Sequence, residues 1–162
     1  MDWENLAGQL DDSGGLMPRR PGFLNAPAVR RAMERHGLDA KRLAVRMGVS
    51  AVTVRSWIGG RSAPNPARLA ALAEALELEM VQLTGVPPAL QTLADLRIHA
   101  ALNQAEAAAA VGVSRTSLSD YELGVSELPD TLVPRLAQAY GATADEVVEA
   151  WQRSRDTLGP SK

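Results

Sequence analysis

The sequence predicts an all-α protein that is built from two similar helical units. Hydrophobic residues make up 46% of the 162 residues and aromatic residues only 4%, so Ala, Leu and Val must form the core. Ala and Leu favour helices, and little of the chain alternates in the way a half-buried strand does. The segment MGVSAVTVRSWIGG at 47–60 recurs as VGVSRTSLSDYELG at 111–124. A repeat of this kind indicates two copies of one fold.

The two copies align without a gap when the sequence is shifted by 64 residues. The positions that match are apolar residues and glycines, which packing and turns hold constant while surfaces diverge. The matching pairs are Leu38 with Leu102, Ala44 with Ala108, Gly48 with Gly112, Val54 with Leu118, Trp57 with Tyr121, Gly60 with Gly124, and Leu72 with Leu136.

Capping residues predict where each helix begins and ends. Asn25, Ser50, Ser114 and Thr143 are expected at helix N-termini, and Gly37 is expected to end the first helix. Asn65-Pro66 is a cap followed by a proline in the first turn. In the first copy we expect helices over about 26–36, 39–47, 51–58, 66–76 and 79–83. In the second copy we expect them over about 88–101, 104–111, 115–122, 130–140 and 144–155.

These spans predict four parts of the chain: an N-terminal tail at 1–22, a first domain at 23–86, a second at 87–156 and a C-terminal tail at 157–162. Residues 2–10 can form an amphipathic turn or two with Trp3, Leu6 and Leu10 on one side, and 18–22 has the composition of a linker. Arg19 and Arg20 have two readings, an arm that touches DNA or a solvated tail.

Composition argues against several classes of protein. There is no cysteine, and His36 and His99 are the two histidines, so neither a thiolate metal site nor a catalytic triad is expected. We therefore expect no enzyme activity and no cofactor. No apolar run reaches the roughly 20 residues that a membrane span needs, and the start lacks a signal-peptide pattern. The expected location is the cytoplasm, in association with the nucleoid.

Charge is distributed unevenly between the two copies. Residues 17–70 carry eleven basic and two acidic residues, a local charge of +9, whereas 90–162 carry six basic and ten acidic ones, or −4. The overall charge of −2 hides this contrast. A basic half suggests a polyanionic partner, although two solvated surfaces of opposite sign are the simpler explanation.

The spacing around each Gly-Val-Ser has a geometric meaning. Two helices joined by a three-residue turn cross closely, which suits a small residue at the crossing, here Ala44 or Ala108. Gly48 and Gly112 supply the positive φ of the turn. The helix after each turn then presents its N-terminal end outward, in a shape that fits the major groove of B-DNA.

This pattern resembles the Cro/C1-type helix-turn-helix family (XRE-like regulators) twice, over about 24–84 and 88–155. The resemblance implies two tandem five-helix lambda-repressor-like helix-turn-helix domains in a bacterial or phage regulator. It also implies a phosphate contact for Gln104 and an ion pair between Arg97 and Glu122. The first copy has Met33 and Ile58 at those two positions. A joint change of both residues from charged to apolar is expected if the two side chains are in contact, because losing one ion alone would leave a buried charge unpaired.

The resemblance places the DNA-contacting residues on outward positions of each copy. Ala51 and Val52 can contact thymine methyl groups, and Arg55 and Arg115 can reach guanine edges. The base-reading candidates are Ser50, Ala51, Val52, Arg55 and Ser56 in the first copy, and Arg115, Thr116, Ser119 and Asp120 in the second. The phosphate candidates are Lys41, Arg42, Arg46, Arg61, Gln104 and Ser114.

The second copy has a weaker electrostatic basis for binding DNA, because Asp120, Glu106 and Glu127 repel phosphate. It is a second reader, a weak reader held in place by the first copy, or a former reader now used for dimerisation or partner binding. We expect a sequence-specific transcriptional regulator that binds double-stranded DNA as a homodimer, with the first copy as main reader. The alternative is a protein-interaction module, an antitoxin or a partner of the transcription machinery, that captures its partner through the second copy or the N-terminal segment. Trp151 is either a dimer contact or a core residue.

Overall fold

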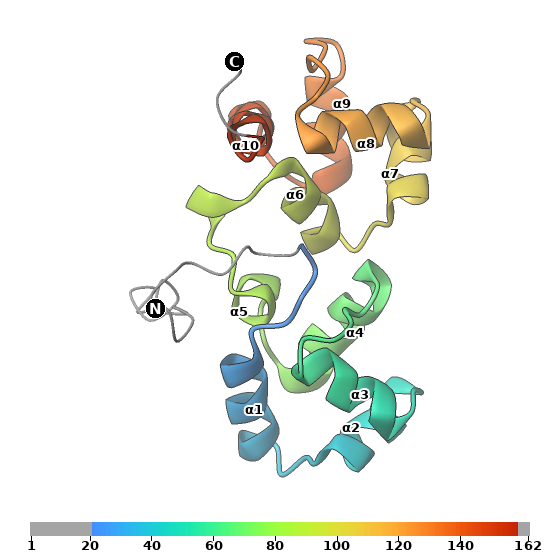
Figure 1. Cartoon of the computed structure of the whole chain (residues 1–162), viewed down its shortest axis with the longest axis vertical. Coiled ribbons are helices and arrows are strands. Elements are labelled where there is room, and N and C mark those ends of the chain that lie inside the picture. Colours follow the sequence, from blue (N-terminus) through green and yellow to red (C-terminus); the bar gives the residue numbers. More distant parts are fainter. Residues whose placement is uncertain (1–20, 159–162) are drawn as a thin grey trace. The chain divides into compact units, whose positions relative to one another are not determined.

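The computed structural model describes residues 21–158, which form ten α-helices and one 3₁₀ turn and contain no strand (Figure 1). The N-terminal segment with Arg19 and Arg20 lies outside the described residues. Clustering of contacts divides the chain into two compact units, one with the described residues up to Pro64 together with Ala71–Pro87, the other with Asn65–Ala70 together with the chain from Pro88 onward. The domain limits expected from the sequence stay a prediction. No helix at 21–158 has the length and apolar character that a bilayer span requires.

The first repeat contains five helices, as the capping residues predict. Their bounds are α1 Ala26–Arg35, α2 Ala40–Met47, α3 Ala51–Ile58, α4 Pro66–Leu76 and α5 Met80–Thr84. Asn65 caps α4 through its side-chain oxygen, which accepts from the Arg68 N–H at 2.8 Å. Asn25 precedes α1 but makes no side-chain cap. Its backbone N–H instead donates to the Leu83 carbonyl at 2.8 Å, which joins the beginning of the repeat to its last helix.

The second repeat also contains five helices. Their bounds are α6 Leu93–His99, α7 Gln104–Val111, α8 Arg115–Leu123, α9 Val133–Tyr140 and α10 Ala144–Asp156. Helix α10 packs on α6, α8 and α9, so the last helix covers most of this repeat. In the first repeat the last helix, α5, has only five residues. The two copies therefore share their order of helices but differ in how the last helix closes the core.

Two helix boundaries expected from the sequence are wrong. Residues 88–101 form a 3₁₀ turn at Pro88–Leu90 and the separate helix α6, because Thr92 caps α6 and exchanges hydrogen bonds with Asp95. The helix expected from residue 130 begins only at Val133. Pro134 explains the later start, since a helix from 130 would need a backbone N–H at 134, which proline lacks.

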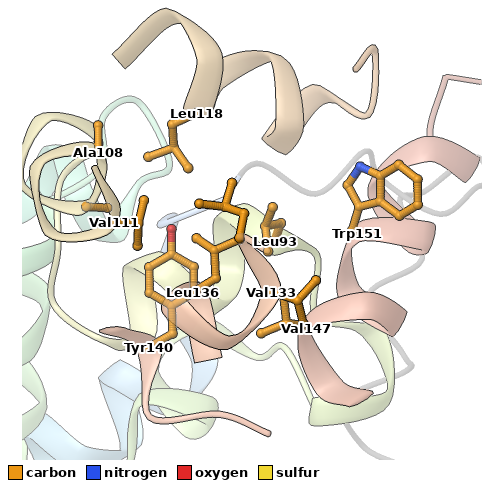
Figure 2. Packing of buried hydrophobic residues seen from close by; sticks show 11 residues of the cluster. Leu93, Ala108, Val111, Leu118, Val133, Leu136, Tyr140, Val147 and Trp151 are labelled. Atoms are coloured by element: carbon orange, nitrogen blue, oxygen red, sulfur yellow. The ribbon is translucent and has the colours of Figure 1, made fainter. Parts of the chain in front are cut away.

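The core of the second repeat collects side chains from all five of its helices (Figure 2). Leu93, Leu118, Leu136 and Val147 are fully buried there. Trp151 belongs to this core rather than to a free surface: it is 8% exposed and its indole N–H donates to the Ser126 carbonyl at 3.3 Å. Burial of these side chains is what holds α7 and α8 in place.

Candidate nucleic-acid interface

The same turn joins α2 to α3 and α7 to α8. Gly48 and Gly112 adopt φ angles of 67° and 76°, the left-handed conformation that the sequence predicts for them. The residue after each glycine then donates its N–H to the alanine at the helix crossing, Val49 to Ala44 and Val113 to Ala108, both at 3.0 Å. Both alanines are 3% exposed. A close crossing of two helices over a small residue is thus present twice.

Helix α3 is anchored on one face and open on the other. Val54 and Trp57 are 1% and 4% exposed and point inward, as expected. Ser50 caps the helix, because its hydroxyl accepts from the Thr53 N–H at 3.1 Å. The outward face is therefore presented by a helix whose first turn is fixed by its own cap.

The five base-reading candidates of the first copy divide into two kinds. Val52 and Arg55 are fully on the exposed face, and Ala51 is half-buried between them. Ser50 and Ser56 are already engaged, Ser50 in the cap and Ser56 in a hydroxyl–hydroxyl bond with Ser62 at 2.7 Å. The exposed pair is therefore better placed to read bases, while the two serines shape the ends of α3.

Basic side chains surround this face. Lys41, Arg42 and Arg46 are exposed on α2, and Arg61 is exposed in the loop after α3. The Arg61 guanidinium lies close to Gly59: a Cβ at Gly59 would be 3.8 Å from Arg61 Nε. This repeat thus carries four exposed cations on the helix before α3 and in the loop after it, of which Arg42 also donates to the Gly37 carbonyl at 3.3 Å. Exposed cations on these two elements suit contacts to phosphate.

The second copy presents the corresponding helix with a different surface. Arg115 and Thr116 are exposed, whereas Ser119 and Asp120 are half-buried. Ser114 caps α8 by accepting from the Ser117 N–H at 3.0 Å. Where the first copy has Lys41, Arg42, Arg46 and Arg61, the second has Ala105, Glu106, Ala110 and Val125. None of these four positions is basic in the second copy, although the exposed Arg135 of α9 reaches the α7–α8 turn and donates to the Val111 carbonyl at 3.4 Å.

Arg97 and Glu122 form the ion pair that the family resemblance implies. Both guanidinium Nε and Nη2 donate to the two carboxylate oxygens, and the side chains are 10% and 6% exposed. Arg97 also donates to the Leu102 carbonyl at 2.9 Å, and the Gln104 amide donates to Glu122 at 3.0 Å. The buried charges are thus paired and hydrogen-bonded. The NH₂ group of Gln104, expected at phosphate, is engaged with Glu122.

The first copy replaces this network by apolar packing. Met33 is 8% exposed and Ile58 is half-buried, at the positions of Arg97 and Glu122. The ion pair that joins α6 to the end of α8 therefore has no charged equivalent at these two positions of the first copy.

Tyr140 brings a buried hydroxyl close to this network. Its oxygen has no hydrogen-bond partner among the described residues and points into the cluster (Figure 2). Burial raises the pKa of Tyr140 above its ordinary value; the charge of Glu122 raises the pKa further and that of Arg97 lowers it. The hydroxyl therefore stays protonated at any pH at which the protein is ordinarily studied.

Three apolar side chains were not identified as exposed from the sequence. Val45 on α2 is 82% exposed, next to the basic residues of that helix. In the second copy Leu123 and Val125 are 54% and 59% exposed at the end of α8. The break in apolar periodicity at Val45 is the signal that could have identified it, whereas the exposure of Leu123 depends on the turn that follows α8.

The comparison with known families agrees with this geometry. A family model described as helix-turn-helix matches residues 29–83, which contain α2 and α3. A second family model, described as helix-turn-helix domain, matches residues 90–151, which contain α7 and α8. No curated protein matches the chain. The two matches confirm both the kind of domain and its tandem repetition.

Proposed function

We propose that the first copy is the main reader of DNA sequence. The chain belongs to the Cro/C1-type helix-turn-helix family and contains its domain in two tandem copies. A DNA-binding regulator is the function that the two domains carry. In our proposal α3 enters the major groove, Val52 and Arg55 read base edges, and the cations on α2 and in the following loop hold the backbone. Ala51, half-buried in the first turn of α3, is a further candidate for a base contact.

The charge difference between otherwise equivalent faces carries this proposal. Lys41, Arg42, Arg46 and Arg61 are exposed around α3, and three uncharged residues and a glutamate stand in their places around α8. Phosphate contacts supply most non-specific affinity and set the register of the protein on the duplex. The first copy has cations at four positions where the second copy has none.

Selection of bound duplexes from a random pool tests the proposal with the full chain. We expect Arg55→Ala to relax the preference at one base pair of the selected site, whereas Arg115→Ala leaves the first copy's half of the site unchanged. Arg35→Ala on α1 is the matched control, because it removes an exposed arginine outside the two-helix motif. Binding without sequence preference, or with no fall in affinity at higher salt, would refute the proposal.

For the second copy we propose dimerisation, with binding of a separate protein as the alternative. Exposed Leu123 and Val125, at the end of α8 and beyond, favour an apolar contact over a phosphate contact. Sedimentation of Leu123→Glu with Val125→Glu measures this directly. A dimer in the wild type and a monomer in the variant support dimerisation, and a wild-type monomer at all concentrations contradicts it. A cytoplasmic, nucleoid-associated homodimer follows from the two proposals together.

A further inference from the structure

An exposed valine at the start of α3 has no explanation in the stability of the fold. Val52 is 71% exposed, so its side chain adds little to the core. A β-branched residue is also a poorer helix former than the alanine, lysine or glutamine that usually occupies such a surface position. The first turn of α3 does not depend on it, because Ser50 and Thr53 close the cap. The position is therefore free to serve binding.

Val52 and Arg55 lie on the same face of α3. Residues three apart on a helix are neighbours, with Cβ atoms about 5–6 Å apart, and both of these side chains are exposed while Val54 and Trp57 face inward. Stacked base pairs rise by about 3.4 Å. A short side chain and a long one at this spacing can therefore contact neighbouring base pairs, the valine close to the helix and the arginine further along the groove.

The chemistry of the two side chains identifies what they contact. Valine has no hydrogen-bonding group, and the apolar group that the major groove offers is the C5-methyl of thymine. Arginine pairs best with the O6 and N7 acceptors of guanine. Because χ1 of valine is stiff, its methyl groups are held in place before binding.

We propose that α3 reads the C5-methyl group of a pyrimidine through Val52, on a base pair next to the guanine that Arg55 contacts. The inference rests on the proposed function of the first copy and adds the chemical group that is read. The second copy lacks this pair: the equivalent positions are Thr116 and Ser119. The combination of an apolar side chain with an arginine three residues later is thus present in the first copy alone.

The test removes single methyl groups from the DNA. The full chain is bound to its selected site and to a series of duplexes in which one thymine at a time is replaced by deoxyuridine, and affinities are measured by fluorescence anisotropy. We expect one replacement, next to the guanine that Arg55→Ala ceases to require, to weaken binding about three- to tenfold. In Val52→Ala that difference between thymine and deoxyuridine should disappear.

Val45→Ala is the matched control, because Val45 is another largely exposed valine of the same repeat, on α2, at 82% against 71% for Val52. It should keep the thymine–deoxyuridine difference of the wild type. Both variants change exposed residues, and circular dichroism checks that they fold. The proposed methyl contact is overturned if the chain selects a site but binds all deoxyuridine duplexes with equal affinity, or if Val52→Ala keeps the affinity difference between thymine and deoxyuridine. In either case the proposed function of the first copy is unaffected. If the chain selects no site, the proposed function itself fails.

Discussion

The two copies build one motif and support it differently. Around the turn both use a buried alanine, a left-handed glycine and a serine cap. Behind the helix that follows the turn, the second copy has a buried network of Arg97, Glu122 and Gln104, while the first has Met33 and Ile58. In front of it the first copy is basic and the second is not. The comparison teaches that the turn depends on few residues, and that its support and its surface can change separately.

The largest expected effect comes from changing the buried ion pair between Arg97 and Glu122. Arg97→Met leaves the Glu122 carboxylate buried without its cation, which should cost the second copy about 3–5 kcal/mol of unfolding free energy. Adding Glu122→Ile reproduces the pairing of the first copy and should recover most of that loss. Urea unfolding followed by circular dichroism measures both. A double variant as unstable as the single one would show that the two supports are not interchangeable.

The next effect separates two glycines at equivalent positions. A Cβ on Gly124 would lie 2.7 Å from the Cα and N of Arg155, and φ there is +76°. Gly124→Ala should therefore cost about 3 kcal/mol, from the left-handed conformation and the clash together. Gly60 has a similar φ of +72° but nothing within 4 Å, so Gly60→Ala should cost only about 1–2 kcal/mol. Equal losses in thermal or urea unfolding would contradict the difference in packing.

A smaller effect concerns the charged surface. Arg46→Ala gives α2 the residue that α7 has at the equivalent position, and should reduce the slope of log K against log salt by about one phosphate contact, or about 0.9. The reverse change, Ala110→Arg, should leave the slope unchanged if the second copy does not touch DNA. A steeper slope in Ala110→Arg would show that α7 lies near the backbone after all.

The smallest effect concerns Tyr140. Removing its buried, unpaired hydroxyl in Tyr140→Phe should leave the unfolding free energy unchanged or raise it by up to about 1 kcal/mol. Because the folded-state pKa is raised above the ordinary value of 10.0, the contribution of the neutral hydroxyl is complete below that pH and is lost as the pH rises further. Above pH 10 the unfolding free energy of Tyr140→Phe should therefore fall less with rising pH than that of the wild type. A marked loss of stability near neutral pH would mean that the hydroxyl has a partner.

Local signals in the sequence were sufficient for most of the fold. Ser50, Ser114 and Thr143 cap their helices, and Gly48 and Gly112 are left-handed, because these effects depend on a few adjacent residues. The ion pair between Arg97 and Glu122 was predicted from the resemblance to the helix-turn-helix family. The start of α6 was missed although Thr92 and Asp95 form a recognisable capping box, because the apolar pattern of 88–101 continues across it.

Other features depend on contacts between distant residues. The residues near Gly124 in the sequence do not predict that the backbone of α10 packs against it. The residues near Ser56 likewise do not predict that its hydroxyl bonds to Ser62 instead of facing outward. The list of base-reading candidates was therefore longer than the set of side chains that are exposed and unengaged. Hydrogen bonding separates Val52 and Arg55 from the two serines: Ser50 is exposed but caps α3, and the half-buried Ser56 bonds to Ser62.

The contact at Gly124 also affects the order in which the two domains can fold during synthesis. The end of α8 packs against the backbone of Arg155 in α10, so the second domain is complete only after residue 155 has been synthesised. Helix α3 belongs to a repeat whose last helix ends at Thr84. Because domains generally fold from the N-terminus during translation, the basic domain should be ready while its acidic neighbour is still being made, and a chain interrupted before residue 155 should retain the first domain alone.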